Sequence, residues 1–278
     1  MSETITRDYL ERMAGKIRRL TVESIYRAQS GHPGGALSSA DILSVLYFDI
    51  MDIDPQEPSR RDRDRLILSK GHSAPAYYAA LALRGYFNAE ELKRLRQGEE
   101  TLQGHPSMHR TPGVDYSSGS LGQGLSIAGG MALYAARNDL PSTIFCLCGD
   151  GELQEGQIWE AAMSAAHYRL RNLILIVDDN GLQIDGRVAD VMNHAPLREK
   201  FLSFGWDAKE VDGHDVEALQ GALHSVYRKA EGPTVILAKT VKGKGVSFME
   251  NEASWHGSAP TKEQYERAVR ELEGGRYE

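Results

Sequence analysis

The sequence predicts an α/β fold with a mostly parallel central sheet and helices on both faces. Continuous apolar runs such as 143–147 and 173–177 lack the alternation of a half-exposed strand, so they predict strands that are buried on both faces. The segments between such runs repeat apolar residues every three to four positions, which predicts helices. Strands that alternate with helices in this way form parallel sheets with helices packed on each side.

The same two patterns place the elements in chain order. Apolar residues recur at helical spacing over 10–20, which predicts the first helix. Ser38 with Asp41 three positions later resembles a capping box, so a second helix is predicted to begin there and to run to Leu46. The further predictions are a strand at 66–68, a helix ending near 83, helices at 89–96 and 125–136, a strand at 143–147, a helix at 155–168, strands at 173–177 and 206–211, a helix at 216–230 and a strand at 234–238.

One long segment, 98–124, has little periodicity and many turn-forming residues. A loop of this length inside a compact domain is usually functional or disordered. No internal repeat, low-complexity segment or linker interrupts the pattern elsewhere. Residues 1–278 are therefore predicted to form a single domain.

Composition and charge exclude several classes of protein. The 278 residues carry a formal net charge of −7, which argues against a broad basic surface for nucleic acid. The longest aliphatic run, 173–177, is far too short to span a membrane, and residues 1–20 contain no hydrophobic signal block. The two cysteines, Cys146 and Cys148, offer no disulfide framework. We therefore expect a cytoplasmic protein that binds neither nucleic acid nor a membrane.

The strongest chemical signal is Gly149-Asp150-Gly151 after one buried strand, with Asn180 after the next. Parallel strands would bring both to one edge of the sheet, with neighbouring strand ends roughly 5 Å apart. A carboxylate and an amide oxygen suit Mg²⁺ or Ca²⁺, and Mg²⁺ usually takes its remaining ligands from phosphate oxygens and water. The pattern therefore predicts a diphosphate bridged by metal, approached closely by the two glycines. The alternative is two unrelated turns.

Three weaker signals accompany it. The glycine-rich segment 118–124 leads into a helix and could hold an anion or simply pack closely on the sheet. The basic turn 239–245 could contact phosphate, form a lid or be a solvated turn. Four histidines lie in Gly- and Pro-rich turns, without the i, i+4 spacing of a helical zinc site, and are candidates for proton transfer near neutral pH. They are His32, His72, His105 and His256.

Eight segments in this order carry a resemblance that covers residues 30–257. They read SGHPGG from 30, LSKGH from 68, GHP from 104, GSLGQG from 119, GDGELQEG from 149, NGLQIDG from 180, KTVKG from 239 and WHG from 255. Together they resemble the N-terminal, thiamine diphosphate-binding part of transketolase. The resemblance implies the thiamine diphosphate-binding fold and its diphosphate-binding domain.

The resemblance also implies a cofactor, thiamine diphosphate, held by Mg²⁺, for which Ca²⁺ or Mn²⁺ could substitute. The implied metal ligands are the side chains of Asp150 and Asn180 and the main-chain carbonyl of Leu182. Ile184 would pack on the thiazolium ring. The remaining residues implied to contact the cofactor are His72, Gly119, Ser120, Leu121, Gly122, Gly149, Gly151 and His256.

For catalysis, the resemblance implies transfer of a two-carbon ketol group from a ketose phosphate to an aldose phosphate. His32, His72, His105 and His256 would face the substrate channel, where they bind hydroxyls and move protons. Glu155 would join a carboxylate network between subunits. Pentose phosphates are the default substrates, and a specialised ketose phosphate is the alternative.

The chain departs from the family in length. Transketolases continue into a pyrimidine-binding domain, which supplies the glutamate that activates the cofactor, and a C-terminal domain. We therefore expect the N-terminal subunit of a split transketolase, active only with a C-terminal transketolase subunit in an α2β2 assembly. The alternatives are a deoxyxylulose-phosphate synthase-like subunit, a two-oxoacid dehydrogenase alpha-like subunit and a non-catalytic or regulatory cofactor-binding subunit.

Overall fold

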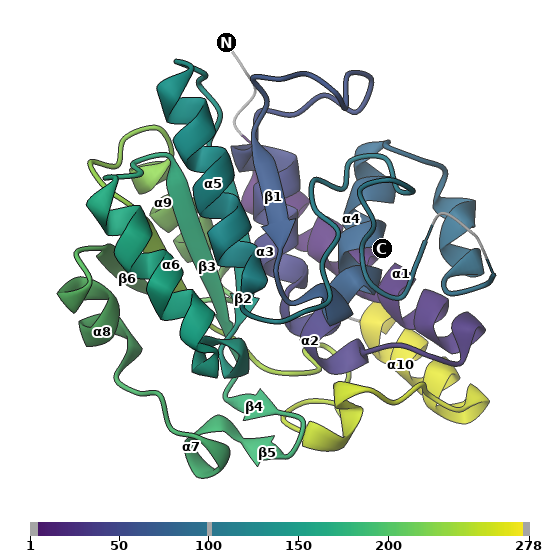
Figure 1. Cartoon of the computed structure of the whole chain (residues 1–278). Coiled ribbons are helices and arrows are strands. Elements are labelled where there is room, and N and C mark those ends of the chain that lie inside the picture. Colours follow the sequence, from purple (N-terminus) through teal and green to yellow (C-terminus); the bar gives the residue numbers. More distant parts are fainter. Residues whose placement is uncertain (1–4, 99–101, 275–278) are drawn as a thin grey trace.

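A five-stranded parallel sheet forms the centre of the computed structural model, which describes residues 5–98 and 102–274 (Figure 1). The strand order is β1-β2-β3-β7-β6, and every neighbouring pair is parallel. This confirms the predicted α/β class and each predicted strand. The strands are β1 (Arg65–Leu68), β2 (Ile144–Gly149), β3 (Leu173–Asp179), β6 (Asp207–Asp212) and β7 (Thr234–Lys239).

Helices cover both faces of this sheet, as predicted. Successive strand side chains point to opposite faces, so the sheet contributes to two separate apolar cores. Figure 1 shows α5 and α6 side by side over one face, with α3 and α4 beyond the other. The helices of the first face are α5 (Gln123–Arg137), α6 (Gly156–His167) and α8 (Leu197–Ser203). Those of the second are α1 (Arg7–Ala28), α3 (Ala40–Val45), α4 (Ala74–Arg84) and α9 (Val216–Val226).

The remaining elements lie mainly beyond the carboxyl ends of the strands. Several of them have no periodic signal, so the sequence did not predict them. They are α2 (Pro33–Ser38), a π-helical turn (Leu46–Ile50), the 3-10 turns Gly71–Ser73, Ala89–Arg94, Gly151–Gln154 and Ala253–His256, the hairpin of β4 (Leu182–Gln183) and β5 (Gly186–Arg187), α7 (Val188–Val191) and α10 (Lys262–Gly274). The predicted helix at 89–96 is one of these 3-10 turns. Of the predicted loop 98–124, residues 99–101 lie outside the described residues, and 102–122 contain no helix or strand.

The predicted capping box at Ser38 is wrong. The chain already turns into α2 at Pro33, and α3 begins only at Ala40, without a side-chain cap. The Ser38 hydroxyl donates instead to Asp178 Oδ2 at 2.6 Å. Asp41 pairs with the buried guanidinium of Arg18. Both side chains that would have formed the cap therefore bind partners that are distant in the sequence.

Two further findings concern the cysteines and the helices. Cys146 and Cys148 are both free and buried, and their sulfur atoms lie 3.7 Å apart in β2. Within residues 5–98 and 102–274, no helix combines the length and the apolar character needed to cross a membrane.

Candidate active site

The neighbouring strands β2 and β3 end at one edge of the sheet and bring Asp150 and Asn180 together. Asp150 is 2% exposed, and its two carboxylate oxygens accept from the amides of Gly151 at 2.8 Å and Gly181 at 2.6 Å. Asn180 Oδ1 accepts from the amide of Leu182 at 3.1 Å. The turns that carry the two predicted oxygen donors therefore lie against each other, joined by the hydrogen bond from Gly181 to Asp150.

The charges around these oxygens suit a cation. Burial, and then the neighbouring carboxylates of Asp178 and Asp179, raise the pKa of Asp150 to about 7. The ammonium group of Lys242 donates to the Leu182 carbonyl oxygen at 3.2 Å, and burial lowers the pKa of this lysine to about 8. A carboxylate, an amide oxygen and a main-chain carbonyl form a donor set that fits Mg²⁺ or Ca²⁺. The residues present therefore fit the implied metal.

Three of the four predicted histidines form a cluster. The ring centroids of His32 and His72 lie 5.4 Å apart, those of His32 and His256 also 5.4 Å, and those of His72 and His256 5.0 Å. The rings come from three separate segments: the turn before α2, the 3-10 turn after β1 and the 3-10 turn near residue 256. His105 is more exposed and lies against Gly71, where an added Cβ would be 3.2 Å from the His105 ring.

All four histidines are held in the neutral form. Burial, followed by nearby positive charge, lowers the pKa of His32 and of His256 to about 4. The same causes lower the pKa of His72 well below its usual value, and they also lower that of His105. The folded protein therefore presents uncharged imidazoles at neutral pH, which can both donate and accept a proton.

Two cations determine which ring nitrogen carries the proton. Lys242 Nζ lies 3.1 Å from His256 Nδ1, and Arg96 Nη2 lies 3.4 Å from His32 Nδ1. Because lysine and arginine only donate, both Nδ1 atoms accept and the proton is assigned to Nε2. The basic turn 239–245 pointed to Lys242, whereas no local pattern marks Arg96.

A buried carboxylate that the sequence also missed lies beneath this cluster. Asp178, at the end of β3, is 0% exposed and accepts from the ammonium of Lys70 and the hydroxyl of Thr240. It also accepts from Ser38 Oγ at 2.6 Å and Asn180 Nδ2 at 3.2 Å. Burial raises its pKa, but the charge of Lys70 and the hydrogen bonds from Lys70, Ser38 and Thr240 together outweigh burial, so the pKa of Asp178 lies below its usual value.

The last residues of the glycine-rich segment 118–124 contact the segments that follow β1 and β2. The amide of Gly122 donates to the buried Glu152 carboxylate at 2.8 Å, and the amide of Gly124 donates to Ser69 Oγ at 3.1 Å. An added Cβ on Gly124 would lie 2.9 Å from Ser69 Cα, so close packing explains this glycine. The first residues, Gly119, Ser120 and Leu121, are exposed. Glu155 is exposed as well, and Glu152 is the buried carboxylate of this turn.

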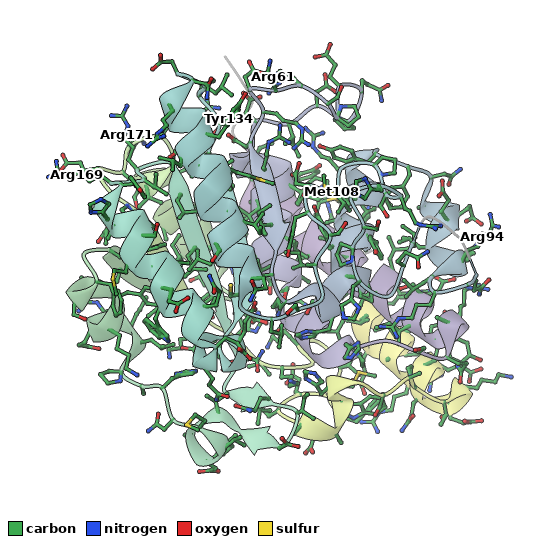
Figure 2. The ribbon with its side chains drawn as sticks, in the orientation of Figure 1. Arg61, Arg94, Met108, Tyr134, Arg169 and Arg171 are labelled. Carbon is green, nitrogen blue, oxygen red and sulfur yellow. The ribbon has the colours of Figure 1, made fainter. Side chains whose placement is uncertain are left out.

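The site edge has one exposed apolar side chain and two buried polar groups without a partner. Ile184, on the hairpin of β4 and β5, is 67% exposed. The buried hydroxyl oxygens of Ser73 and Ser118 have no hydrogen-bond partner within the part of the chain that the structure describes. A separate groove of about 790 Å³ lies at the opposite edge of the sheet, where Figure 2 shows Arg169 and Arg171.

Comparisons with known proteins agree with this geometry. The family model "Transketolase, thiamine diphosphate binding domain" matches residues 10–275. The 6-deoxy-6-sulfo-D-fructose transketolase subunit SqwG of Clostridium sp. is 47% identical, over 95% of this chain and 96% of that protein. One of the subunits of apulose-4-phosphate transketolase from Phocaeicola vulgatus is 41% identical, over 95% of this chain and 93% of that one.

Longer transketolases match over their corresponding part. Human transketolase is 40% identical over 95% of this chain, which spans 42% of the human protein. The crystal structure of transketolase from Campylobacter jejuni superimposes with a TM-score of 0.91 at 34% identity, covering 97% of this chain and 43% of that one. The chain therefore belongs to the transketolase family and carries its thiamine diphosphate-binding domain.

Proposed function

We propose that this chain is the N-terminal subunit of a two-subunit transketolase, which transfers a two-carbon ketol group from a ketose phosphate to an aldose phosphate. The observation that carries the proposal is the position of three neutral histidines beside the oxygen donors at the carboxyl edge of the sheet. Bound thiamine diphosphate would supply the carbon nucleophile and the electron sink for breaking a carbon–carbon bond.

The metal would be held by this chain. Asp150, Asn180 and the carbonyl of Leu182 would bind Mg²⁺, with Ca²⁺ or Mn²⁺ as substitutes. Gly149 and Gly151, which have no side chain, are proposed to let the main chain approach the diphosphate. Further cofactor contacts are proposed for Ile184 and the loop Gly119, Ser120, Leu121 and Gly122, with His72 and His256 near the diphosphate.

The histidines would bind substrate hydroxyls and move protons. His32 and His256 each carry their proton on Nε2, so these atoms can donate to a hydroxyl or to an oxygen that gains negative charge. Lys242 remains mostly protonated near neutral pH and adds positive charge beside them. His105 is proposed to act at the more exposed end of this channel. Glu155, which is exposed, is proposed to meet a carboxylate network between subunits.

The partner in this proposal is a C-terminal transketolase subunit with the pyrimidine-binding and C-terminal domains, in an α2β2 assembly. The names of the two bacterial relatives describe subunits. Large apolar side chains on the outer faces of α5 and α6 support a docking surface, because Ile127, Tyr134 and Met163 are 37%, 48% and 62% exposed. A cytoplasmic location is also proposed, in keeping with free cysteines in β2.

The substrate is a ketose phosphate or a related sugar with another anionic group. Pentose phosphates are the default, whereas the relatives' names point to apulose 4-phosphate and to 6-deoxy-6-sulfo-D-fructose. Coexpression with the polypeptide encoded beside this chain, followed by ketol-transfer assays on a panel of phosphorylated and sulfonated ketoses, tests the proposal.

The expected result is turnover that needs thiamine diphosphate and Mg²⁺. It should be lost in Asp150→Asn and retained in Asp190→Asn, which alters an exposed carboxylate of α7. A complex that binds the cofactor but turns over none of the ketoses would instead favour a non-catalytic or regulatory subunit.

A further inference from the structure

We infer that Asp178 is a positioning residue, which aims the Asn180 amide oxygen at the metal and ties together the loops that carry the site. The inference rests on the proposed metal site at Asp150 and Asn180. Asp178 lies opposite Gly149 of β2 and Ala238 of β7, in the middle of the sheet edge. Its carboxylate is contacted by α2 and by the segments that follow β1, β3 and β7.

The Asp178 carboxylate determines which way the Asn180 side chain faces. A carboxylate only accepts, so the Asn180 amide turns its nitrogen toward Asp178 Oδ2, at 3.2 Å. Its oxygen is then directed to the other side, where it accepts from Leu182. The reverse orientation would place two acceptor oxygens against each other inside the protein, which is unfavourable. The metal-facing oxygen is therefore preset before any metal binds.

The same carboxylate fixes the loops of the histidine cluster. Lys70, two residues before His72, donates both to Asp178 and to the carbonyl of Gly35 at 2.9 Å. Thr240, two residues before Lys242, donates to the second carboxylate oxygen. Ser38 also donates its hydroxyl hydrogen to Asp178. It lies at the end of α2, the helix that begins immediately after His32. One buried group thus links the metal ligand to the residues that would face the substrate.

A reciprocal exchange of the two side chains tests this. The full chain is prepared as wild type, Asp178→Asn, Asn180→Asp and the double variant, and Mn²⁺ binding in the presence of thiamine diphosphate is followed by electron paramagnetic resonance. Asn180→Asp places two carboxylates face to face without a donor between them. Asp178→Asn removes the carboxylate that orients the amide. Each single variant should bind Mn²⁺ at least about tenfold more weakly, a loss of about 1.4 kcal/mol.

The double variant should recover binding by at least about threefold over either single variant, because an amide again donates to a carboxylate. Thermal unfolding without metal monitors folding of each variant. Asp207→Asn is the control, since Asp207 is exposed at the start of β6 and pairs with Lys209, and it should stay within about twofold of wild type.

Each outcome has a distinct meaning. If wild type binds no Mn²⁺ with thiamine diphosphate, the proposed metal site fails, and the inference with it. If wild type binds but Asn180→Asp binds as tightly or more tightly, only the positioning role is overturned, because the added charge then acts as a better ligand. This comparison of wild type with Asn180→Asp remains informative even if Asp178→Asn does not fold. If the double variant loses as much Mn²⁺-binding free energy as the two single variants together, the positioning role of Asp178 is also overturned.

Discussion

Replacing His256 with glutamine should make the folding stability of the protein less sensitive to acid. Burial, and then Lys242 and His32, lower the pKa of His256 from 6.5 to about 4 in the folded chain. Between these values the unfolded state binds a proton that the folded state does not. The contribution of His256 to folding stability therefore becomes less favourable as the pH drops from 6.5 toward 4, and a glutamine removes this contribution.

The size of the effect follows from the two pKa values. At about pH 5, a fully buried imidazole with these values would cost about 2 kcal/mol relative to about pH 8. His256 is partly exposed, so solvent screening reduces the expected effect to about 1 kcal/mol. His32 and His72, whose pKa values are also lowered, remain in the variant. The pH dependence should therefore become shallower without disappearing.

Equilibrium urea denaturation at about pH 8 and about pH 5 measures this difference directly. His167→Gln, which alters an exposed histidine at the end of α6, is the control and should follow wild type. If the His256 variant loses as much stability between the two pH values as wild type does, the His256 imidazole of folded wild type is already protonated at the lower pH. The description of a neutral histidine cluster would then be refuted.

Three further changes test the packing, the ion pair and the metal. Gly124→Ala would place a Cβ 2.9 Å from Ser69 Cα, so the start of α5 must shift, and urea denaturation should show a loss of about 1–3 kcal/mol. Lys70→Met leaves the buried Asp178 carboxylate without its cation, and the unfolding free energy should fall by about 3–5 kcal/mol. Adding Mg²⁺ and thiamine diphosphate should raise the thermal unfolding temperature of wild type. A chelator should abolish that rise, and Asp150→Asn should not show it.

The fold could be predicted from the sequence because local patterns determine most of it. The buried runs 143–147 and 173–177 became neighbouring parallel strands, and this placed Asp150 and Asn180 at one edge. The four histidines stood out because they lie in turns of unusual composition. Residue type and position after a strand were sufficient to bring Asp150 beside the turn that carries Asn180, and the metal and proton-transfer roles stay predictions.

The groups that orient those residues could not be predicted, because their partners come from distant parts of the chain. Asp178 reads as the last residue of an apolar strand, yet it binds Ser38, 140 residues away, and Lys70, 108 residues away. The predicted capping box failed for the same reason, since Ser38 and Asp41 bind tertiary partners. Arg96 reaches Ser30 across 66 residues without any local signal.

The central claim is that this chain holds the metal and the diphosphate while a partner completes the active site. The most direct test is the rate of ketol transfer as purified partner subunit is titrated into a fixed amount of this chain, with thiamine diphosphate, Mg²⁺ and substrates saturating. The account predicts no rate from either polypeptide alone and a rise that levels off at an equimolar ratio. A full rate from this chain alone, or none from the mixture, would contradict it.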